Sequence, residues 1–312
     1  MKQEKFDFYD KTSLKSYNLD TSMRYQLNML DSLDVYTRKH CENVASITCR
    51  LCEYLHCKKD FIEYCTICAY LHDIGKMFIP PKILQKNEPL TDEEYEVMKT
   101  HTTIGYKMCM GDKKLMPYAI GAKCHHEALN GTGYPEGLSG NDIPYEAQII
   151  RVADEYDAIV SKRQYKSHID ISDTIKILIE NSQPLPKTNP NFSKVKNPHF
   201  GKNNPKIVKA LIKVVIDDTE YEISCMFSYI DYLKENIKRL KNIKKYDEKR
   251  LKAKKDKEKS YYEEGMKMLF SDGETIENYL DILAQYEEAL INRTDILNKL
   301  FEEVKKIKKL KV

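Results

Sequence analysis

The sequence of 312 residues predicts an all-α protein, in which a helical bundle is followed by a helical, coiled-coil-like extension. Two observations support this fold class. Apolar residues recur every three or four positions along several segments between residues 34 and 161, which is the period of amphipathic helices. Apolar residues then recur every seven positions from 276 to 307, which is typical of helices that pack side by side. We therefore divide the chain into an N-terminal extension (1–24), a helical domain (25–216) and a charged helical region (217–312).

Composition and charge exclude several classes of protein. Hydrophobic residues make up 41% of the chain and charged residues 32%, which is typical of a globular protein. The formal net charge of +3 is too small to indicate a nucleic-acid polymer as a partner. No apolar run approaches the roughly 20 residues of a membrane-spanning helix, and the first residues lack the apolar core of a secretory signal. We therefore expect a cytoplasmic protein whose partners include neither a membrane nor a nucleic-acid polymer.

Apolar stripes place the helices of the helical domain in order along the chain. Gly75 provides a stop for the second helix, and Thr91 and Glu94 have the spacing of a capping box that opens the third. The segments 127–144 and 182–205 are rich in Gly, Pro and Asn and predict loops. The stripes predict helices at 34–55, 61–73, from 91 to about 108, 117–127 and 145–161, and a final short helix at 207–216.

The charged helical region has two parts. In residues 231–260 Lys and Arg outnumber Asp and Glu about two to one, which favours a solvated helix or helical linker. From 276 to 307 an apolar seam must be buried either against the preceding helix or against a second copy of the chain, so a homodimer or a partner helix through 276–307 is left open. The first row of this seam is Ile276, Leu283, Leu290, Leu297 and Val304.

The nine cysteines include two Cys-x-x-Cys pairs, which are candidate zinc sites. The pairs are Cys49 with Cys52 and Cys65 with Cys68. Their helical spacing places them on apolar faces, where a cysteine behaves as a small hydrophobic residue. We therefore favour buried, reduced thiols over a separate zinc site.

Seven histidine and aspartate side chains fall on the apolar stripes, where polar groups are not expected. Burying a neutral polar group without a partner costs roughly 2–7 kcal/mol, and burying a charge costs more. A metal cluster would satisfy all of them together, because imidazole and carboxylate groups suit divalent first-row ions. The seven candidate ligands are His40, His72, Asp73, His101, His125, His126 and Asp154.

The adjacent pair His72 and Asp73 indicates two ions rather than one. Neighbouring residues of a helix point about 100° apart, so Asp73 could bridge two ions while His72 binds one of them. Two ions roughly 3.5–4 Å apart support phosphoryl transfer with a hydroxide held between them, and seven ligands leave positions for water and substrate. His40, His72 and Asp154 would complete one shell, and His101, His125 and His126 the other.

Three basic residues lie near this constellation in the sequence. Lys76 is one helical turn beyond His72 and could reach a phosphate or the hydroxide. Arg163 and Lys166 are one turn apart and could grip a phosphate, although by themselves they are equally compatible with a solvated helix face.

Taken together, these residues resemble the HD-GYP family, bacterial members of the HD phosphohydrolase superfamily. The resemblance covers roughly residues 25–216, and its motifs are specific in combination. They are residues 34–40 (DVYTRKH), 71–76 (LHDIGK), 125–127 (HHE), 130–135 (NGTGYP) with Gly137 and Leu138, 152–158 (VADEYDA) and 163–166 (RQYK).

The resemblance implies an HD-domain helical bundle with a metal centre, commonly of iron or manganese. It implies hydrolysis of the second messenger cyclic di-GMP to linear pGpG, and in some members onward to GMP, by attack of a metal-activated hydroxide. It makes the seven side chains metal ligands, with Asp73 and Lys76 also catalytic. Arg163 and Lys166 would contact the nucleotide, and Gly133 and Tyr134 would shape the substrate site.

Two departures from the family pattern change these expectations. Members with three metals have a glutamate where this chain has Tyr36, so we expect two divalent ions, Fe or Mn, rather than three. Gln164 replaces the usual proline, which affects the stiffness of the segment more than its chemistry.

Two other functions remain open at this point. One is a receptor that binds a cyclic dinucleotide without cleaving it, although such a receptor does not need all seven ligands. The other is a hydrolase of a different cyclic dinucleotide, such as cyclic GMP-AMP, or of a nucleotide. The motifs do not distinguish guanine from adenine, and the same ligand set accepts Mn, Fe, Co or Zn.

Overall fold

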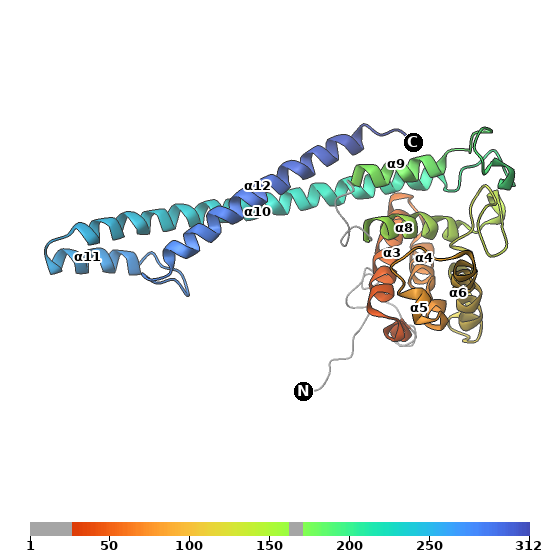
Figure 1. Ribbon diagram of the computed structural model, residues 1–312, viewed down its shortest axis with the longest axis horizontal. Helices are drawn as coiled ribbons and strands as arrows, with labels where there is room; N and C mark the ends of the chain where they lie inside the picture. The colour runs from red at the N-terminus through yellow and green to blue at the C-terminus, as the bar shows by residue number, and fades with distance from the viewer. Residues whose placement is uncertain (1–26, 162–170) are drawn as a thin grey trace. The chain divides into compact units, whose positions relative to one another are not determined.

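The structure, a computed structural model, describes residues 27–161 and 171–312. Every regular element in these residues is a helix, which confirms the all-α prediction. The chain forms two compact units, one of Met1–Val215 with Lys309–Val312 and the other of Ile216–Lys308 (Figure 1). In the part of the chain that is described, every helix is too short or too polar to cross a membrane.

The first unit begins with a short 3-10 helix, η2 (Asn28–Ser32), and two packed α-helices. Helix α3 (Val35–Tyr54) starts at Asp34, whose Oδ1 accepts hydrogen bonds from the backbone N–H groups of Tyr36 and Thr37 at 3.1 Å each. This cap satisfies amide groups that have no partner within the helix. Helix α4 (Lys59–Leu71) is buried along most of its second half, from Cys65 to Leu71, and so forms the centre of the unit.

The turn after α4 crosses the next long helix at very short range. It forms the 3-10 helix η3 (Ile74–Phe78), followed by the short α5 (Pro81–Leu84) and by α6 (Asp92–Met110). A Cβ atom on Gly75 would lie 2.0 Å from the carbonyl oxygen of His101, so a glycine is required for this approach. The crossing brings residues 72–76 next to the face of α6 that carries His101.

The capping box predicted for the start of α6 is present. The Thr91 side chain accepts a hydrogen bond from the backbone of Glu94, and the Glu94 carboxylate accepts one from the backbone N–H of Thr91. This reciprocal pair positions the first turn of the helix.

The helix predicted at 117–127 is shorter than expected. It consists of η4 (Met116–Tyr118) and α7 (Ala119–Cys124), and His125 and His126 lie beyond its end. The expected loop from 127 to 144 contains only the 3-10 turn η5 (Gly140–Asp142) and leads into α8 (Tyr145–Ser161). Helix α7 lies against α4, where a Cβ atom on Gly121 would be 2.7 Å from both the Cβ and the carbonyl oxygen of Cys68.

Helix α9 (Ile171–Ser182), which the sequence analysis did not predict, precedes the expected loop at 182–205. This loop contains the 3-10 turn η7 (Phe192–Lys194). The backbone of the loop is bonded to neighbouring segments: the Leu129 N–H donates to the Lys202 carbonyl, and the Lys202 N–H donates to the Asn181 carbonyl. The loop is therefore part of the packed unit.

The prediction of a short helix at 207–216 is wrong. The helix that starts there is α10 (Pro205–Lys252), with 48 residues. It continues through the polar residues at 217–220 because apolar residues recur at helical spacing beyond them and are buried in the second unit: Ile223, Ile230, Leu233, Ile237, Leu240 and Ile243.

In the second unit the later part of α10 runs alongside α12 (Tyr279–Lys308), and α11 (Asp256–Lys267) connects them (Figure 1). The predicted seam is buried against α10 of the same chain, with Leu297 and Val304 packed on Ile223 and Ile230. Its first member, Ile276, lies in the turn before α12. A second copy of the chain is therefore not required to bury this seam.

All nine cysteines are free thiols, and seven of them are buried. The members of both Cys-x-x-Cys pairs are among the buried ones, as expected from their apolar surroundings.

We expect Gly121→Ala to lower the thermal midpoint, with a destabilisation of about 1–3 kcal/mol. Alanine gains up to about 1 kcal/mol of helix propensity over glycine, but its methyl group would overlap the Cys68 backbone, which cannot move freely. Gly111→Ala is the matched control, because its Cβ would meet its nearest atom at 3.4 Å, an ordinary contact. A thermal midpoint of Gly121→Ala equal to that of the control would contradict the close packing of α4 and α7.

Candidate metal centre

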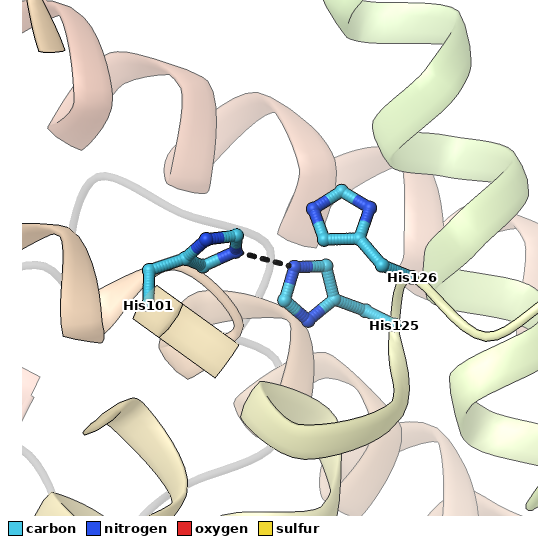
Figure 2. Close-up of side chains that lie close together, drawn as sticks. All are labelled: His101, His125 and His126. Atoms are coloured by element: carbon cyan, nitrogen blue, oxygen red, sulfur yellow. Dashed lines mark hydrogen bonds between the residues drawn. The ribbon is translucent and has the colours of Figure 1, made fainter. Parts of the chain in front are cut away.

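The seven predicted ligands come from five separate segments and converge in the first unit. His40 lies on α3 and Asp154 on α8. His72 and Asp73 follow the end of α4, and His101 lies on α6. The last two, His125 and His126, follow the end of α7. Figure 2 shows the rings of His101, His125 and His126 gathered together.

Asp73 lies at the centre of the cluster, with only 1% of its surface exposed. Its Oδ1 faces Nε2 of His101 at 3.3 Å and Nε2 of His125 at 3.8 Å. Its Oδ2 faces Nε2 of His72 at 3.3 Å and Nε2 of His40 at 3.6 Å. The two carboxylate oxygens thus face two different pairs of histidines, as a bridging ligand requires.

Asp154, like Asp73, faces histidines from both of the predicted groups of ligands. Its Oδ1 lies 3.0 Å from His40 Nε2 and 3.9 Å from His72 Nε2, and its Oδ2 lies 3.9 Å from His126 Nδ1. Three groups of side chains have ligand atoms close enough together to hold an ion: His101 with His125 and His126, His40 with His72 and Asp73, and His72 with His125 and Asp154.

Backbone carbonyl groups fix the orientation of three histidines. The Nδ1 atoms of His72 and His101 lie 2.7 Å and 2.6 Å from the carbonyl oxygens of Ala69 and Met98. The Nδ1 of His125 lies 3.0 Å from the Gly121 carbonyl oxygen. A neutral imidazole that donates from Nδ1 has a lone pair on Nε2, and these Nε2 atoms point into the cluster.

Two buried atoms of the cluster lack a hydrogen-bond partner among the described residues. They are His72 Nε2 and Asp73 Oδ1, and leaving such an atom unsatisfied costs about 1–3 kcal/mol. The Nε2 atoms of His101 and His125 lie 3.3 Å apart (Figure 2), yet both are acceptors when both Nδ1 atoms donate. A cation between these atoms satisfies all of them. The residues therefore fit a metal centre with nitrogen and oxygen ligands.

The electrostatic environment favours neutral histidines on one side of the cluster. Burial lowers the pKa values of His101 and His125 below the ordinary value, and it lowers the pKa of His126 to about 3. These imidazoles are therefore neutral at neutral pH, and each has one ring nitrogen with a lone pair. That is the state in which histidine binds a metal ion.

The two aspartates are charged. Burial by itself would raise their pKa values, but the positive charge of Lys76 holds the pKa of Asp73 well below its usual range, with help from His72. The hydrogen bond from His40 lowers the pKa of Asp154 in the same way. Burial also opposes the charge of His40, yet Asp154 and Asp157 raise the pKa of this histidine to about 10.

Lys76 provides a positive charge at the edge of the cluster. Its Nζ lies 2.5 Å from Asp73 Oδ2. Burial opposes its charged form, but the Asp73 carboxylate outweighs burial and raises the pKa of the ammonium group above the ordinary value. Lys76 is therefore protonated at neutral pH.

Sequence reasoning gave no role to Asp157, which contacts the His40 ring on the side that faces away from the other ligands. Its Oδ2 lies 2.7 Å from His40 Nδ1, and its Oδ1 accepts a hydrogen bond from Asn43 at 3.0 Å. This carboxylate turns His40 Nε2 towards Asp73 and Asp154, as carboxylates often do behind metal-binding histidines. The sequence signal was its position three residues after Asp154, on the same face of the helix.

Glu127 and Arg151 also were not predicted to have roles. The buried Glu127 carboxylate accepts hydrogen bonds from the backbone N–H groups of Glu136 and Leu138, at 2.7 Å and 2.8 Å. Arg151 donates to the carbonyl oxygen of His126 at 3.2 Å. Both residues hold the segment that follows α7 against the cluster.

Of the four residues predicted to bind the substrate, the structure describes two. Tyr134 stacks on the His126 ring, with centroids 4.7 Å apart, and Gly133 allows close approach because its Cβ would lie 2.4 Å from the His126 carbonyl oxygen. Both line a pocket of about 690 Å³ beside the cluster. Arg163 and Lys166, like Gln164, lie outside the described residues.

Comparison with known proteins gives a family and several relatives. The family model described as HD domain matches residues 24–185. A cyclic di-GMP phosphodiesterase of Thermotoga maritima is 36% identical over 62% of this chain and 49% of its own length. The cyclic di-GMP phosphodiesterase response regulator RpfG of Xanthomonas campestris is 39% identical over 40% of this chain and 34% of its own length. The 3′3′-cGAMP-specific phosphodiesterase 2 of Vibrio cholerae is 33% identical over 47% of this chain and 29% of its own length.

The matched region thus spans about half the length of the Thermotoga relative and about a third of the other two. The family match covers the residues that contribute the cluster, from His40 to Asp154. These matches confirm the resemblance drawn from the motifs.

We expect Asp157→Ala to weaken Mn²⁺ binding about 10- to 100-fold, because His40 would lose the group that orients it. Asp157→Asn keeps an oxygen that accepts from Nδ1–H and should cause a smaller loss. Asp173→Ala is the matched control, since the Asp173 side chain is half-exposed and pairs with Lys176, and neither residue belongs to the cluster. Titration of metal-free protein with Mn²⁺ measures the affinity, and wild-type affinity in Asp157→Ala would contradict the positioning role.

Proposed function

This chain belongs to the HD domain family, and from that premise we propose that it is a metal-dependent phosphodiesterase that hydrolyses cyclic di-GMP to linear pGpG. The observation that carries the proposal is the buried cluster of seven side chains, in which atoms of His72 and Asp73 lack partners. Relatives named as cyclic di-GMP phosphodiesterases support the choice of substrate. The cytoplasmic location expected from the sequence stays a prediction.

We propose that the cluster holds two divalent ions, iron or manganese. One would bind near His40, His72 and Asp154 and the other near His101, His125 and His126, with Asp73 between them. When bound, such ions lower the pKa of a water molecule and neutralise charge on the phosphate oxygens. A third ion is not part of the proposal, because Tyr36 stands where a further carboxylate ligand is expected and its side chain is 72% exposed.

The reaction adds one water molecule to the cyclic dinucleotide. A bond forms between the water oxygen and phosphorus, the bond from phosphorus to the 3′ oxygen breaks, and the 3′ oxygen receives a proton. The product carries a 5′ phosphate and a 3′ hydroxyl group.

The chain itself provides a fixed positive charge that would stabilise the phosphate during this reaction. Lys76 holds a proton on Nζ beside Asp73, so its positive charge faces the place where negative charge develops on the phosphate. Burial of His72, Asp73 and His125 excludes water from the inner side of the cluster, which strengthens these interactions. We assign to Arg163, Lys166, Gly133 and Tyr134 the binding of the nucleotide.

A related substrate is the second candidate. Relatives named as 3′3′-cGAMP-specific phosphodiesterases are 29% and 33% identical to this chain. The cluster itself acts on the phosphodiester and does not distinguish the base, so the same centre would hydrolyse a mixed cyclic dinucleotide by the same chemistry.

We expect the double variant His72→Ala with Asp73→Ala to lose hydrolysis of cyclic di-GMP down to background, because it removes the central carboxylate and a buried ligand. The assay measures pGpG and GMP by chromatography, with Mn²⁺ or Fe²⁺ under reducing conditions. His199→Ala is the control, since His199 is exposed and outside the cluster, and it should keep wild-type activity.

Turnover by the double variant at normal metal content would refute the assignment of the centre. Tight binding of intact cyclic di-GMP by the metal-loaded wild type without product would instead indicate a receptor. Cleavage of 3′3′-cGAMP but not of cyclic di-GMP would support the second candidate.

A further inference from the structure

The pocket beside the cluster has features that the metal chemistry does not explain. Its volume of about 690 Å³ lies within the range of small-molecule sites. His126 forms part of its wall, so the pocket opens directly beside the candidate metal centre. Figure 2 shows that the His126 ring also lies next to those of His101 and His125. A ligand in the pocket is therefore adjacent to the cluster but is not held by it.

The lining of the pocket is basic and rich in amide groups. Three cations line it, Arg151, Lys194 and Lys202, and none of the described lining residues is an aspartate or glutamate. Such a wall attracts an anion. Four asparagines also line the pocket; Oδ1 of Asn130 and of Asn189 accept hydrogen bonds from Thr132 and Asn191, and Asn181 donates to Glu155. Amide groups can bond to the edges of nucleobases, and Tyr95 and Tyr134 provide aromatic surface. The asparagines are Asn130, Asn181, Asn189 and Asn191.

The walls of the pocket are held in place by the fold. Lys202 is fixed through its backbone, with its N–H bonded to Asn181 and its carbonyl oxygen to Leu129. The carbonyl oxygen of Asn130 accepts from the backbone N–H groups of Lys196 and Asn197, both at 3.0 Å. These bonds join the loop between α9 and α10 to the turn after α7. The pocket is therefore preorganised, which reduces the entropy lost on binding.

Arg151 connects the pocket to the metal centre. Its Nε donates to Asn203 at 2.9 Å, and one Nη donates to the His126 carbonyl oxygen at 3.2 Å. A guanidinium group has five N–H donors, so the same side chain can also face a ligand in the pocket. Asn203 is itself held by Glu155 at 2.8 Å, which fixes the guanidinium plane.

We propose that this pocket binds the second nucleotide of the cyclic dinucleotide, the one remote from the phosphodiester that is cleaved. Lys194, Lys202 and Arg151 contact its phosphate, and its base lies against the wall that the asparagines share with Tyr95 and Tyr134. The inference rests on the proposed function for the identity of the ligand, but it assigns a separate subsite to the loop between α9 and α10. The lysines of this subsite then determine the affinity for the substrate and not the rate of the chemical step.

The test compares two lysines of the same loop in the full-length protein. Lys202→Met removes one of the three positive charges from the pocket while keeping a long side chain. Lys187→Met is the control, because Lys187 is exposed on the same loop and does not line the pocket. Steady-state kinetics use cyclic di-GMP and, as a small diester without a second nucleotide, bis(p-nitrophenyl) phosphate. Equilibrium dialysis with cyclic di-GMP and with GMP measures binding directly.

For Lys202→Met we expect the KM for cyclic di-GMP to rise about tenfold, as for the loss of one contact with a charged group, with kcat nearly unchanged. Adding Lys194→Met should raise KM further. Hydrolysis of bis(p-nitrophenyl) phosphate should not change, and Lys187→Met should match the wild type for both substrates. Binding of cyclic di-GMP in dialysis should weaken about tenfold for Lys202→Met alone.

An unchanged KM and unchanged binding in Lys202→Met and in the double variant with Lys194→Met would overturn the proposal of this subsite. An equal loss with both substrates would also overturn it, because a general effect on the metal centre would then explain the result. If the wild type cleaves bis(p-nitrophenyl) phosphate but not cyclic di-GMP, the proposed function fails. The dialysis result still decides whether the pocket binds a nucleotide.

Discussion

Burial of the Asp73 carboxylate is the constraint on which the rest of the site depends. The group is almost completely enclosed, its Oδ1 has no hydrogen-bond partner among the described residues, and four imidazoles surround it. A carboxylate in such surroundings is stable only if positive charge lies close to it. Lys76 contributes one charge, and the divalent ions that we propose would contribute the remainder. The same ions would turn the unsatisfied atoms of the cluster into ligands.

The fold creates this arrangement through close crossings of short segments. His72 and Asp73 lie where α4 ends, and Gly75 allows the following turn to approach the backbone of α6 at His101. Gly121 allows α7 to approach α4 in a similar way, so that His125 reaches the cluster. Because the ligands come from helix ends as well as from helix faces, small changes in these crossings would move several ligands together.

The sequence predicted the features that depend on local patterns. The capping box at Thr91, the seven candidate ligands and the apolar seam at 276–307 could all be recognised from spacing. Features that depend on tertiary contacts could not. The support of His40 by Asp157 joins residues 117 positions apart. The length of α10 depends on the burial of its later apolar residues, and the pocket forms only where the loop before α10 meets the turn after α7.

The proposed chemistry depends most directly on whether the cluster holds metal. Metal analysis of the full-length protein, purified without oxygen and without added metal, tests this. We predict about two transition-metal ions per chain, iron or manganese, and a marked loss of both in Asp73→Asn. Wild-type protein that contains no tightly bound transition metal, and that takes up none when Fe²⁺ or Mn²⁺ is supplied, would contradict the account.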